Sequence, residues 1–225
     1  MAIILHLETA TTNCSVGISK GDSLLVLKEN NAVGYSHSEQ LHLFIEEALA
    51  EASLSLSDLD AVAVSKGPGS YTGLRIGVST AKGLCFSLDL PLISVPTLES
   101  LARQLEVKAG ELLIPVLDAR RMEVYSAVFD SQYRQLRETR AEIVDENSFG
   151  AYTSVDRVHF LGSGAGKIQE TLRAKNFSFD SSVLPSAAQM VVPAHRKYRA
   201  SDFEDLAYFE PFYLKDFLVQ TKKRP

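Results

Sequence analysis

The sequence Lys66-Gly-Pro-Gly-Ser-Tyr-Thr-Gly-Leu-Arg-Ile-Gly77 decides how the chain folds around it. It follows the apolar run Ala61–Ser65, which is typical of a buried strand. Gly67-Pro68-Gly69 predicts a turn, and the hydroxyl group of Ser70 or Thr72 can cap a helix that runs to about Leu88. The block therefore predicts a strand, a tight turn and a helix, which is a unit typical of α/β proteins.

Small residues recur along one side of this helix. Gly73, Gly77 and Ala81 are four residues apart and share one stripe of the helix surface. Glycine inside a helix costs roughly 1 kcal/mol relative to alanine. Two glycines on one stripe therefore predict that another backbone approaches the helix closely.

A similar strand pattern occurs twice in the chain. Strands are expected at Ile3–Leu7 and Cys14–Ser19, separated by a polar turn that begins with Glu8. The same order returns at Leu112–Leu117 and Glu123–Asp130, with a turn that begins at Asp118. We interpret this as a degenerate internal duplication in an α/β protein with a central mixed sheet, with a soft boundary between the halves near Leu101–Glu111.

Composition excludes several classes of protein. A formal net charge of −5 argues against a protein that binds nucleic acid through its overall electrostatic field. The two cysteines, Cys14 and Cys85, are too few for a disulfide scaffold and predict reduced thiols. The first residues lack a basic region, and no apolar run approaches the roughly 20 residues that span a bilayer. We therefore expect a cytoplasmic protein without membrane contact.

The polar turns and glycine loops allow a phosphate-binding hypothesis. Carboxylates at strand ends, followed by hydroxyl residues, are plausible ligands for a metal-bound phosphate, and glycine loops can offer backbone N–H groups to an anion. The alternative is that the carboxylates cap turns and the glycines allow close packing. The loop Gly67–Gly73 matches neither a Walker A nor a G-x-G-x-x-G motif, and the loop Gly162–Gly166 is equally ambiguous. The candidate nucleotide or phosphate residues are Glu8, Thr9, Gly67, Gly69, Ser70, Asp118, Gly162 and Gly164.

The remaining polar residues form no catalytic pattern. His6 alternates with apolar strand residues, as a core histidine does, and the sequence contains neither H-E-x-x-H nor G-x-S-x-G. Basic residues cluster at Arg196–Arg199 and Lys222–Arg224. We interpret these basic side chains as solvent-exposed surface residues; the alternative is that they contact RNA phosphate.

Four segments together resemble the TsaB (YeaZ) family: Ile4–Thr11, Lys66–Gly77, Val95–Leu98 and Asp118–Tyr125. The resemblance implies a two-lobed actin/hexokinase-like (ASKHA) fold, with residues 1–105 as the first lobe and residues 106–225 as a reduced C-terminal lobe. It also implies a subunit of the bacterial machinery that forms N6-threonylcarbamoyladenosine at position 37 of tRNA. The partners would be the catalytic paralogue TsaD, the ATPase TsaE, and tRNA through the complex.

The resemblance also implies that this chain is not the catalyst. TsaD carries two metal-binding histidines at positions that correspond to Thr97 and Leu101 here, and neither side chain is a useful metal ligand. Glu8 stands where many family members have aspartate, so ATP or ADP would bind only weakly. The alternatives are an ATP-dependent phosphotransferase, which needs a working Glu8 and Asp118 pair, and a zinc peptidase, which needs bound metal and is disfavoured.

In this family two helices of the first lobe pair with TsaD, or with a second copy when TsaD is missing. They correspond here to Ser36–Ala52, with a capping box of Ser36 and Glu39, and to Thr72–Leu88. The alternative is that their apolar faces bury only against the chain's own sheet. The residues expected at the interface are His37, Leu41, Phe44, Ile45, Ala48, Gly73, Leu74, Gly77, Val78 and Ala81.

Overall fold

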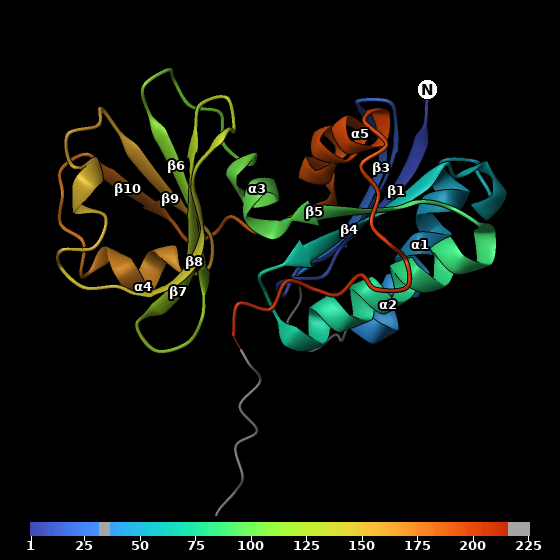
Figure 1. Cartoon of the computed structure of the whole chain (residues 1–225), viewed down its shortest axis with the longest axis horizontal. Coiled ribbons are helices and arrows are strands. Elements are labelled where there is room, and N and C mark those ends of the chain that lie inside the picture. Colours follow the sequence, from blue (N-terminus) through green and yellow to red (C-terminus); the bar gives the residue numbers. More distant parts are fainter. Residues whose placement is uncertain (32–36, 216–225) are drawn as a thin grey trace, which may run out of the picture.

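The computed structural model describes residues 1–31 and 37–215, which form two lobes side by side, each built on a five-stranded sheet (Figure 1). In the first sheet the order is β3-β2-β1-β4-β5, with β1 antiparallel to β2 and parallel to β4. Its strands are β1 (Ile3–Glu8), β2 (Cys14–Lys20), β3 (Ser23–Asn30), β4 (Ala61–Gly67) and β5 (Leu92–Pro96).

The second sheet repeats this topology. Its order is β10-β9-β6-β7-β8, with β6 antiparallel to β7 and parallel to β9. Its strands are β6 (Leu112–Asp118), β7 (Glu123–Asp130), β8 (Gln135–Ile143), β9 (Val158–Leu161) and β10 (Phe177–Asp180). Three antiparallel strands followed by two parallel ones thus occur in both lobes, which confirms the predicted duplication and the two-lobed α/β fold.

The helices distinguish the two lobes. In the first lobe α1 (His37–Glu51) and α2 (Tyr71–Leu88) lie together on one face of the sheet, and α5 (Val191–Arg199) lies on the other (Figure 1). The 3-10 turn η1 (Leu56–Asp58) leads from α1 into β4, and α3 (Thr97–Ala102) leads out of β5 towards the second lobe. The second lobe has only α4 (Ala165–Gln169) and the 3-10 turn η2 (Gly150–Tyr152) at the matching places, so it is the reduced one.

The N-terminal caps decide where the long helices begin. Of the two hydroxyl groups considered for α2, Ser70 is the cap: its Oγ accepts a hydrogen bond from the Gly73 N–H at 3.2 Å. The capping box expected for α1 relies on Ser36, which lies outside the described residues.

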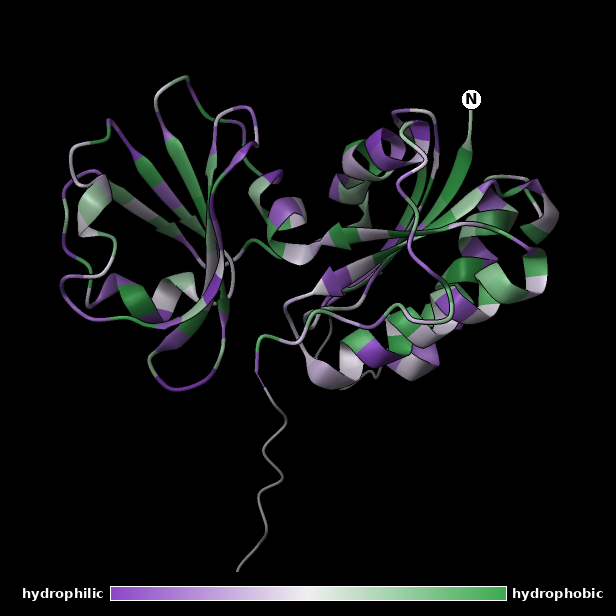
Figure 2. Ribbon diagram, in the orientation of Figure 1, coloured by the Kyte–Doolittle hydropathy of each residue, from purple (hydrophilic) through white to green (hydrophobic). Residues whose placement is uncertain are grey.

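The central strands are apolar on both faces because helices cover both. Along β4, Val62 and Val64 face α1 and α2, while Ala61 and Ala63 face α5. Figure 2 shows these strands as mostly hydrophobic, while the helices that cover them alternate between hydrophobic and hydrophilic residues. In the second lobe the core centres on Phe160, whose ring packs against Phe149 and Phe179.

After β10 the chain returns to the first lobe. The 3-10 turn η3 (Ala187–Met190) and α5 pack against the first sheet, although the predicted division places residues 106–225 in the second lobe. The chain then runs along the edge of that sheet, where the N–H of Glu204 donates to the carbonyl of Leu92 on β5 at 2.9 Å. We call residues 203–215 the strap. It covers the β5 edge, which would otherwise offer unpaired backbone groups.

No helix within residues 1–31 and 37–215 is long and apolar enough to cross a membrane.

Candidate functional site

Glu8, the last residue of β1, is sealed inside the first lobe. Its Oε1 accepts a hydrogen bond from the Ala10 N–H at 2.7 Å, and its Oε2 is buried with no hydrogen-bond partner. Burial raises the pKa of Glu8 to about 7, although hydrogen bonds from Ala10, Ser65 and Thr9 oppose the rise. The carboxyl group therefore caps its own turn, as the alternative reading of this motif proposed, and it is not open to a metal-bound phosphate.

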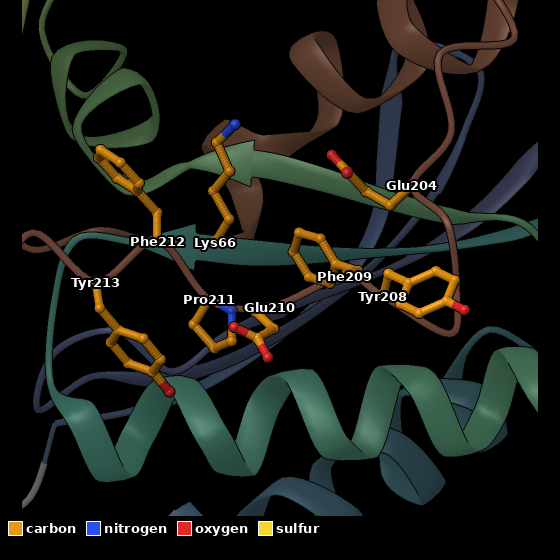
Figure 3. Close-up of a pocket in the computed structure, with 8 residues that line it drawn as sticks. All are labelled: Lys66, Glu204, Tyr208, Phe209, Glu210, Pro211, Phe212 and Tyr213. Atoms are coloured by element: carbon orange, nitrogen blue, oxygen red, sulfur yellow. The ribbon is translucent and has the colours of Figure 1, made fainter.

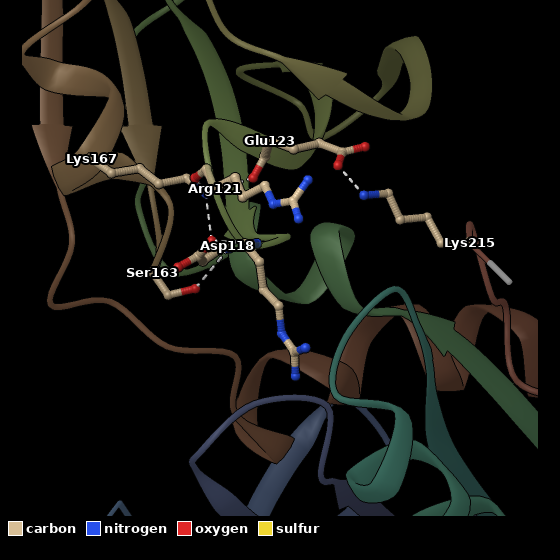
Figure 4. A network of polar contacts seen from close by, with 7 residues as sticks. Asp118, Arg121, Glu123, Ser163, Lys167 and Lys215 are labelled. Atoms are coloured by element: carbon tan, nitrogen blue, oxygen red, sulfur yellow. Dashed lines mark hydrogen bonds and ion pairs between the residues drawn. The ribbon is translucent and has the colours of Figure 1, made fainter. Parts of the chain in front are cut away.

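Asp118 ends β6 as Glu8 ends β1, but its surroundings differ. Its Oδ1 accepts hydrogen bonds from the Arg120 N–H at 2.7 Å and from Lys167 Nζ at 2.5 Å, and its own N–H donates to Ser163 Oγ at 3.2 Å (Figure 4). Lys167 also donates to the carbonyl groups of Arg121 and Glu123. Asp118 is thus exposed and already paired with a lysine of its own lobe.

The start of α2 is occupied by the chain's own β1–β2 turn. The N–H of Ser70 donates to the carbonyl oxygen of Ala10 at 2.7 Å, and the N–H of Gly73 donates to Ser70 Oγ. A β-carbon added at Gly69 would lie 2.4 Å from the Ala10 carbonyl oxygen. Two of the N–H groups that an anion would need are therefore engaged within the chain.

The glycine stripe of α2 faces the same turn. A β-carbon at Gly73 would lie 2.1 Å from the carbonyl oxygen of Thr9, and one at Gly77 would lie 2.3 Å from Thr9 Oγ1. Thr9 Oγ1 donates a hydrogen bond to the Gly73 carbonyl at 2.8 Å. The predicted close approach of another backbone is confirmed, and that backbone belongs to the chain itself.

The second glycine loop also packs against its own lobe. A β-carbon at Gly162 would lie 2.7 Å from the carbonyl oxygen of Val116, and one at Gly164 would lie 3.1 Å from a methyl group of Val124. Both glycines therefore hold the end of β9 against β6 and β7.

Most of the residues expected at a helical interface are part of the core. Only His37 and Phe44 are partly exposed, and His37 Nε2 lies 2.7 Å from the Thr11 carbonyl oxygen. The other eight face the sheet or the Thr9 turn, so a partner cannot reach them while the lobe is folded. They are Leu41, Ile45, Ala48, Gly73, Leu74, Gly77, Val78 and Ala81. The sequence pattern located the buried side of each helix correctly, but this is not the side that a partner can contact.

The outward sides of α1 and α2 carry two exposed apolar residues that the sequence analysis did not select. Leu43 is 55% exposed and Phe86 is 83% exposed. On α1, Leu43 lies roughly opposite the buried Leu41. On α2, Phe86 lies outside the stripe of buried residues. Both side chains therefore point away from the sheet. The sequence could have indicated both residues, because each is apolar but falls outside the periodic positions that face the core of its helix.

Thr97 and Leu101 lie one turn apart on α3, and both side chains are fully buried. Leu101 packs in a cluster between the lobes, and Thr97 Oγ1 has no hydrogen-bond partner. Within the part of the chain that the structure describes, no group of three or more His, Cys, Asp or Glu side chains is placed to hold a metal ion.

Two histidines, His6 and His195, and both cysteines belong to the interior. His6 Nε2 lies 2.7 Å from Ser19 Oγ, which lies 3.0 Å from His195 Nε2 on α5, and burial lowers the pKa of His6 to about 3. Cys14 and Cys85 are free and buried, and burial raises the pKa of each thiol to about 11. His6 is therefore a core residue, as expected, and neither thiol is activated.

The first basic cluster is held in ion pairs. Arg196 pairs with Glu99, Lys197 with Glu204 and Arg199 with Asp22. These contacts fix α5 and the start of the strap to the first lobe. The second cluster, Lys222–Arg224, lies outside the described residues.

Comparisons with known proteins agree with this architecture. The family model described as "TsaD: tRNA N6-adenosine threonylcarbamoyltransferase" matches residues 31–222. The tRNA threonylcarbamoyladenosine biosynthesis protein TsaB of Haemophilus influenzae is 31% identical over 99% of this chain and 97% of its own length. The protein of the same name from Escherichia coli is 30% identical over 99% and 98%. The solved structure of YeaZ from Pseudomonas aeruginosa is 26% identical, with a TM-score of 0.83 over 95% of this chain and 100% of that one.

Proposed function

We propose that this chain, which belongs to the TsaB family of tRNA threonylcarbamoyladenosine biosynthesis proteins, supports a catalytic TsaD subunit in forming N6-threonylcarbamoyladenosine and does not carry out the transfer itself. The observation that carries the proposal is at α3. Thr97 and Leu101 stand where TsaD is expected to have metal-binding histidines, and both are buried side chains that offer no useful ligand. The chain would therefore act through contacts with its partner.

The state of the two strand-end carboxylates also supports a non-catalytic role. A phosphotransferase of this fold would need both Glu8 and Asp118 free to hold a metal-bound phosphate. Glu8 is enclosed, and Asp118 is paired with Lys167. We therefore do not assign ATP or ADP a role in this chain, and the ATPase activity of the complex would come from TsaE.

The outward surface of α1 and α2 is the proposed docking surface for TsaD. Leu43 and Phe86 are exposed there, and burying one large apolar side chain contributes about 1.5–3 kcal/mol. Gly83 lies on the outward side of α2 with open space around it, so a partner helix can approach. A second copy of the chain would use the same surface when TsaD is absent.

The test is co-purification with the cognate TsaD. We expect a 1:1 complex for the natural chain, and a loss of affinity of about tenfold or more for Phe86→Asp and for Leu43→Asp. Ile143→Asp is the matched control, because Ile143 is 75% exposed on β8 of the other lobe. Full binding by the Phe86 and Leu43 variants would exclude this surface.

The same experiment needs a readout of function. Depletion of this protein in cells should lower the threonylcarbamoyladenosine content of tRNA, and the Phe86→Asp variant should not restore it. Unchanged modification after depletion would refute the proposed function. The natural chain, with TsaD present, should bind TsaE and tRNA, and chain purified alone should form a homodimer.

A further inference from the structure

The strap and the end of β4 form a solvent-open hollow of about 520 Å³ that none of the preceding roles uses (Figure 3). It is lined by one lysine, two glutamates, a proline and four aromatic residues of the strap. The lining residues are Lys66, Glu204, Tyr208, Phe209, Glu210, Pro211, Phe212 and Tyr213.

The strap holds this hollow in place through contacts along its length. Lys82 of α2 donates to the carbonyl groups of Ala207 and Phe209 at 3.2 and 3.1 Å. The N–H of Phe212 donates to the Lys66 carbonyl at 2.7 Å, and the ring of Tyr213 lies 5.0 Å from that of Tyr71. The aromatic side chains are therefore presented from a fixed backbone.

A group of exposed apolar side chains on a protein surface often marks an interaction site, whereas a single one is ordinary. Tyr208 is 84% exposed, and the rings of Phe212 and Tyr213 are also open to solvent. These rings line one hollow together, so they form a candidate binding surface. Tyrosine and phenylalanine faces are the platforms on which unpaired bases stack.

The charges around the rings indicate an anionic partner. Among the described residues, the ammonium group of Lys66 has no hydrogen bond or ion pair, and Figure 3 shows its side chain rising beside Phe212. Of the two glutamates, Glu204 is bound by Ser94 and Lys197, and Glu210 points away from Lys66 towards α2. A second hollow on the α2 side of the strap is lined by Arg75, whose guanidinium lies over the Tyr71 ring at 4.1 Å, and by Glu210.

We propose that this strap hollow binds an unpaired nucleotide of single-stranded RNA, with the base against the strap aromatics and a phosphate on Lys66. The inference rests on the proposed function, because the substrate of a tRNA-modifying complex presents its target adenosine in an unpaired loop. Free nucleotides share the same chemistry, but they lack the neighbouring phosphates that Arg75 could reach.

The test is the binding of a fluorescein-labelled RNA hairpin with an unpaired loop, measured by anisotropy with the full chain alone and with its TsaD complex. Tyr208→Ser and Lys66→Gln should each raise the Kd by about fivefold or more, the lower end of the effect of losing one stacked base. Lys66→Gln should also reduce the dependence of log K on log salt by about 0.7, as expected for one phosphate contact on a single strand.

The controls match each variant in exposure and charge. Ile143→Ser removes a comparably exposed apolar side chain from β8, and Lys175→Gln removes an exposed lysine of the second lobe. Both should bind the hairpin as the natural chain does in the chain-alone assay. A fully paired duplex and AMP should bind more weakly than the hairpin.

Several outcomes would overturn the inference. One is that both Tyr208→Ser and Lys66→Gln bind the hairpin with the same Kd as the natural chain. Another is that hairpin and duplex bind equally well. If AMP competes as well as the hairpin loop does, the site is one for free nucleotides. If depletion of the protein lowers tRNA modification while the strap variants bind and function normally, the proposed function stands and only the strap site fails.

Discussion

Substitution of glycines within α2 separates close packing from helix propensity. Gly73→Ala places a β-carbon 2.1 Å from the carbonyl oxygen of Thr9, a backbone atom that cannot rotate away. Relieving such an overlap costs about 1–3 kcal/mol, and the shift would also weaken the hydrogen bond from Thr9 Oγ1 to the Gly73 carbonyl, which contributes about 1 kcal/mol. The gain in helix propensity returns only about 1 kcal/mol. We expect net destabilisation of about 2 kcal/mol.

Gly83→Ala is the matched control, because it makes the same chemical change in the same helix. Nothing lies within 4 Å of a β-carbon at Gly83, so only the propensity gain of about 1 kcal/mol applies. For a chain of this size, 1 kcal/mol corresponds to a Tm shift of about 2–4 °C. In thermal melts followed by circular dichroism, Gly73→Ala should melt about 4–8 °C lower than the natural chain and Gly83→Ala about 2–4 °C higher. Equal stability of the two variants would refute the close approach of the Thr9 turn.

Three further predictions concern buried or paired charges. The raised pKa of Glu8 contributes a fall in stability of about 3 kcal/mol as pH rises from about 4.5 to 7, and Glu8→Gln should remove this contribution in urea titrations at several pH values. The lowered pKa of His6 acts in the opposite direction: it contributes a loss of stability as pH falls from 6.5 towards 3, by about 2 kcal/mol between pH 6.5 and 5, and His6→Gln should remove that contribution. The natural chain should therefore show a shallow profile between pH 5 and 6.5, and the two variants should show slopes of opposite sign. Lys167→Met removes the cation that pairs with Asp118, so it should lower the Tm only slightly while leaving TsaD binding unchanged; loss of binding would place the Asp118 turn in the interface.

The sequence predicted the elements whose stabilising partners are local or periodic. The apolar runs of β1, β4 and β6 and the cap at Ser70 follow from strand burial and helix capping. The strand β8 was missed because it lies at an exposed edge, where alternating charged residues hide the strand pattern.

The C-terminal elements were missed for a different reason. The helix α5 is only nine residues long, and its position depends on contacts distant in sequence, such as Arg196 with Glu99. The strap is held by Lys82 and by the edge of β5, which no local pattern indicates. Such contacts come from the tertiary fold, and they can be recognised only after the sheet order is known.

The glycine block illustrates a limit of another kind. Gly73 and Gly77 predict that another backbone segment comes close to α2, but they do not predict which segment it is. The turn at Thr9 supplies it, and in doing so it closes the strand end where a nucleotide would meet Glu8. In the second lobe the corresponding turn stays exposed but is neutralised by Lys167. Because the inner side of α2 is committed to this contact, the proposed docking surface lies on its outer side, and Phe86→Asp tests that surface without disturbing the Thr9 turn.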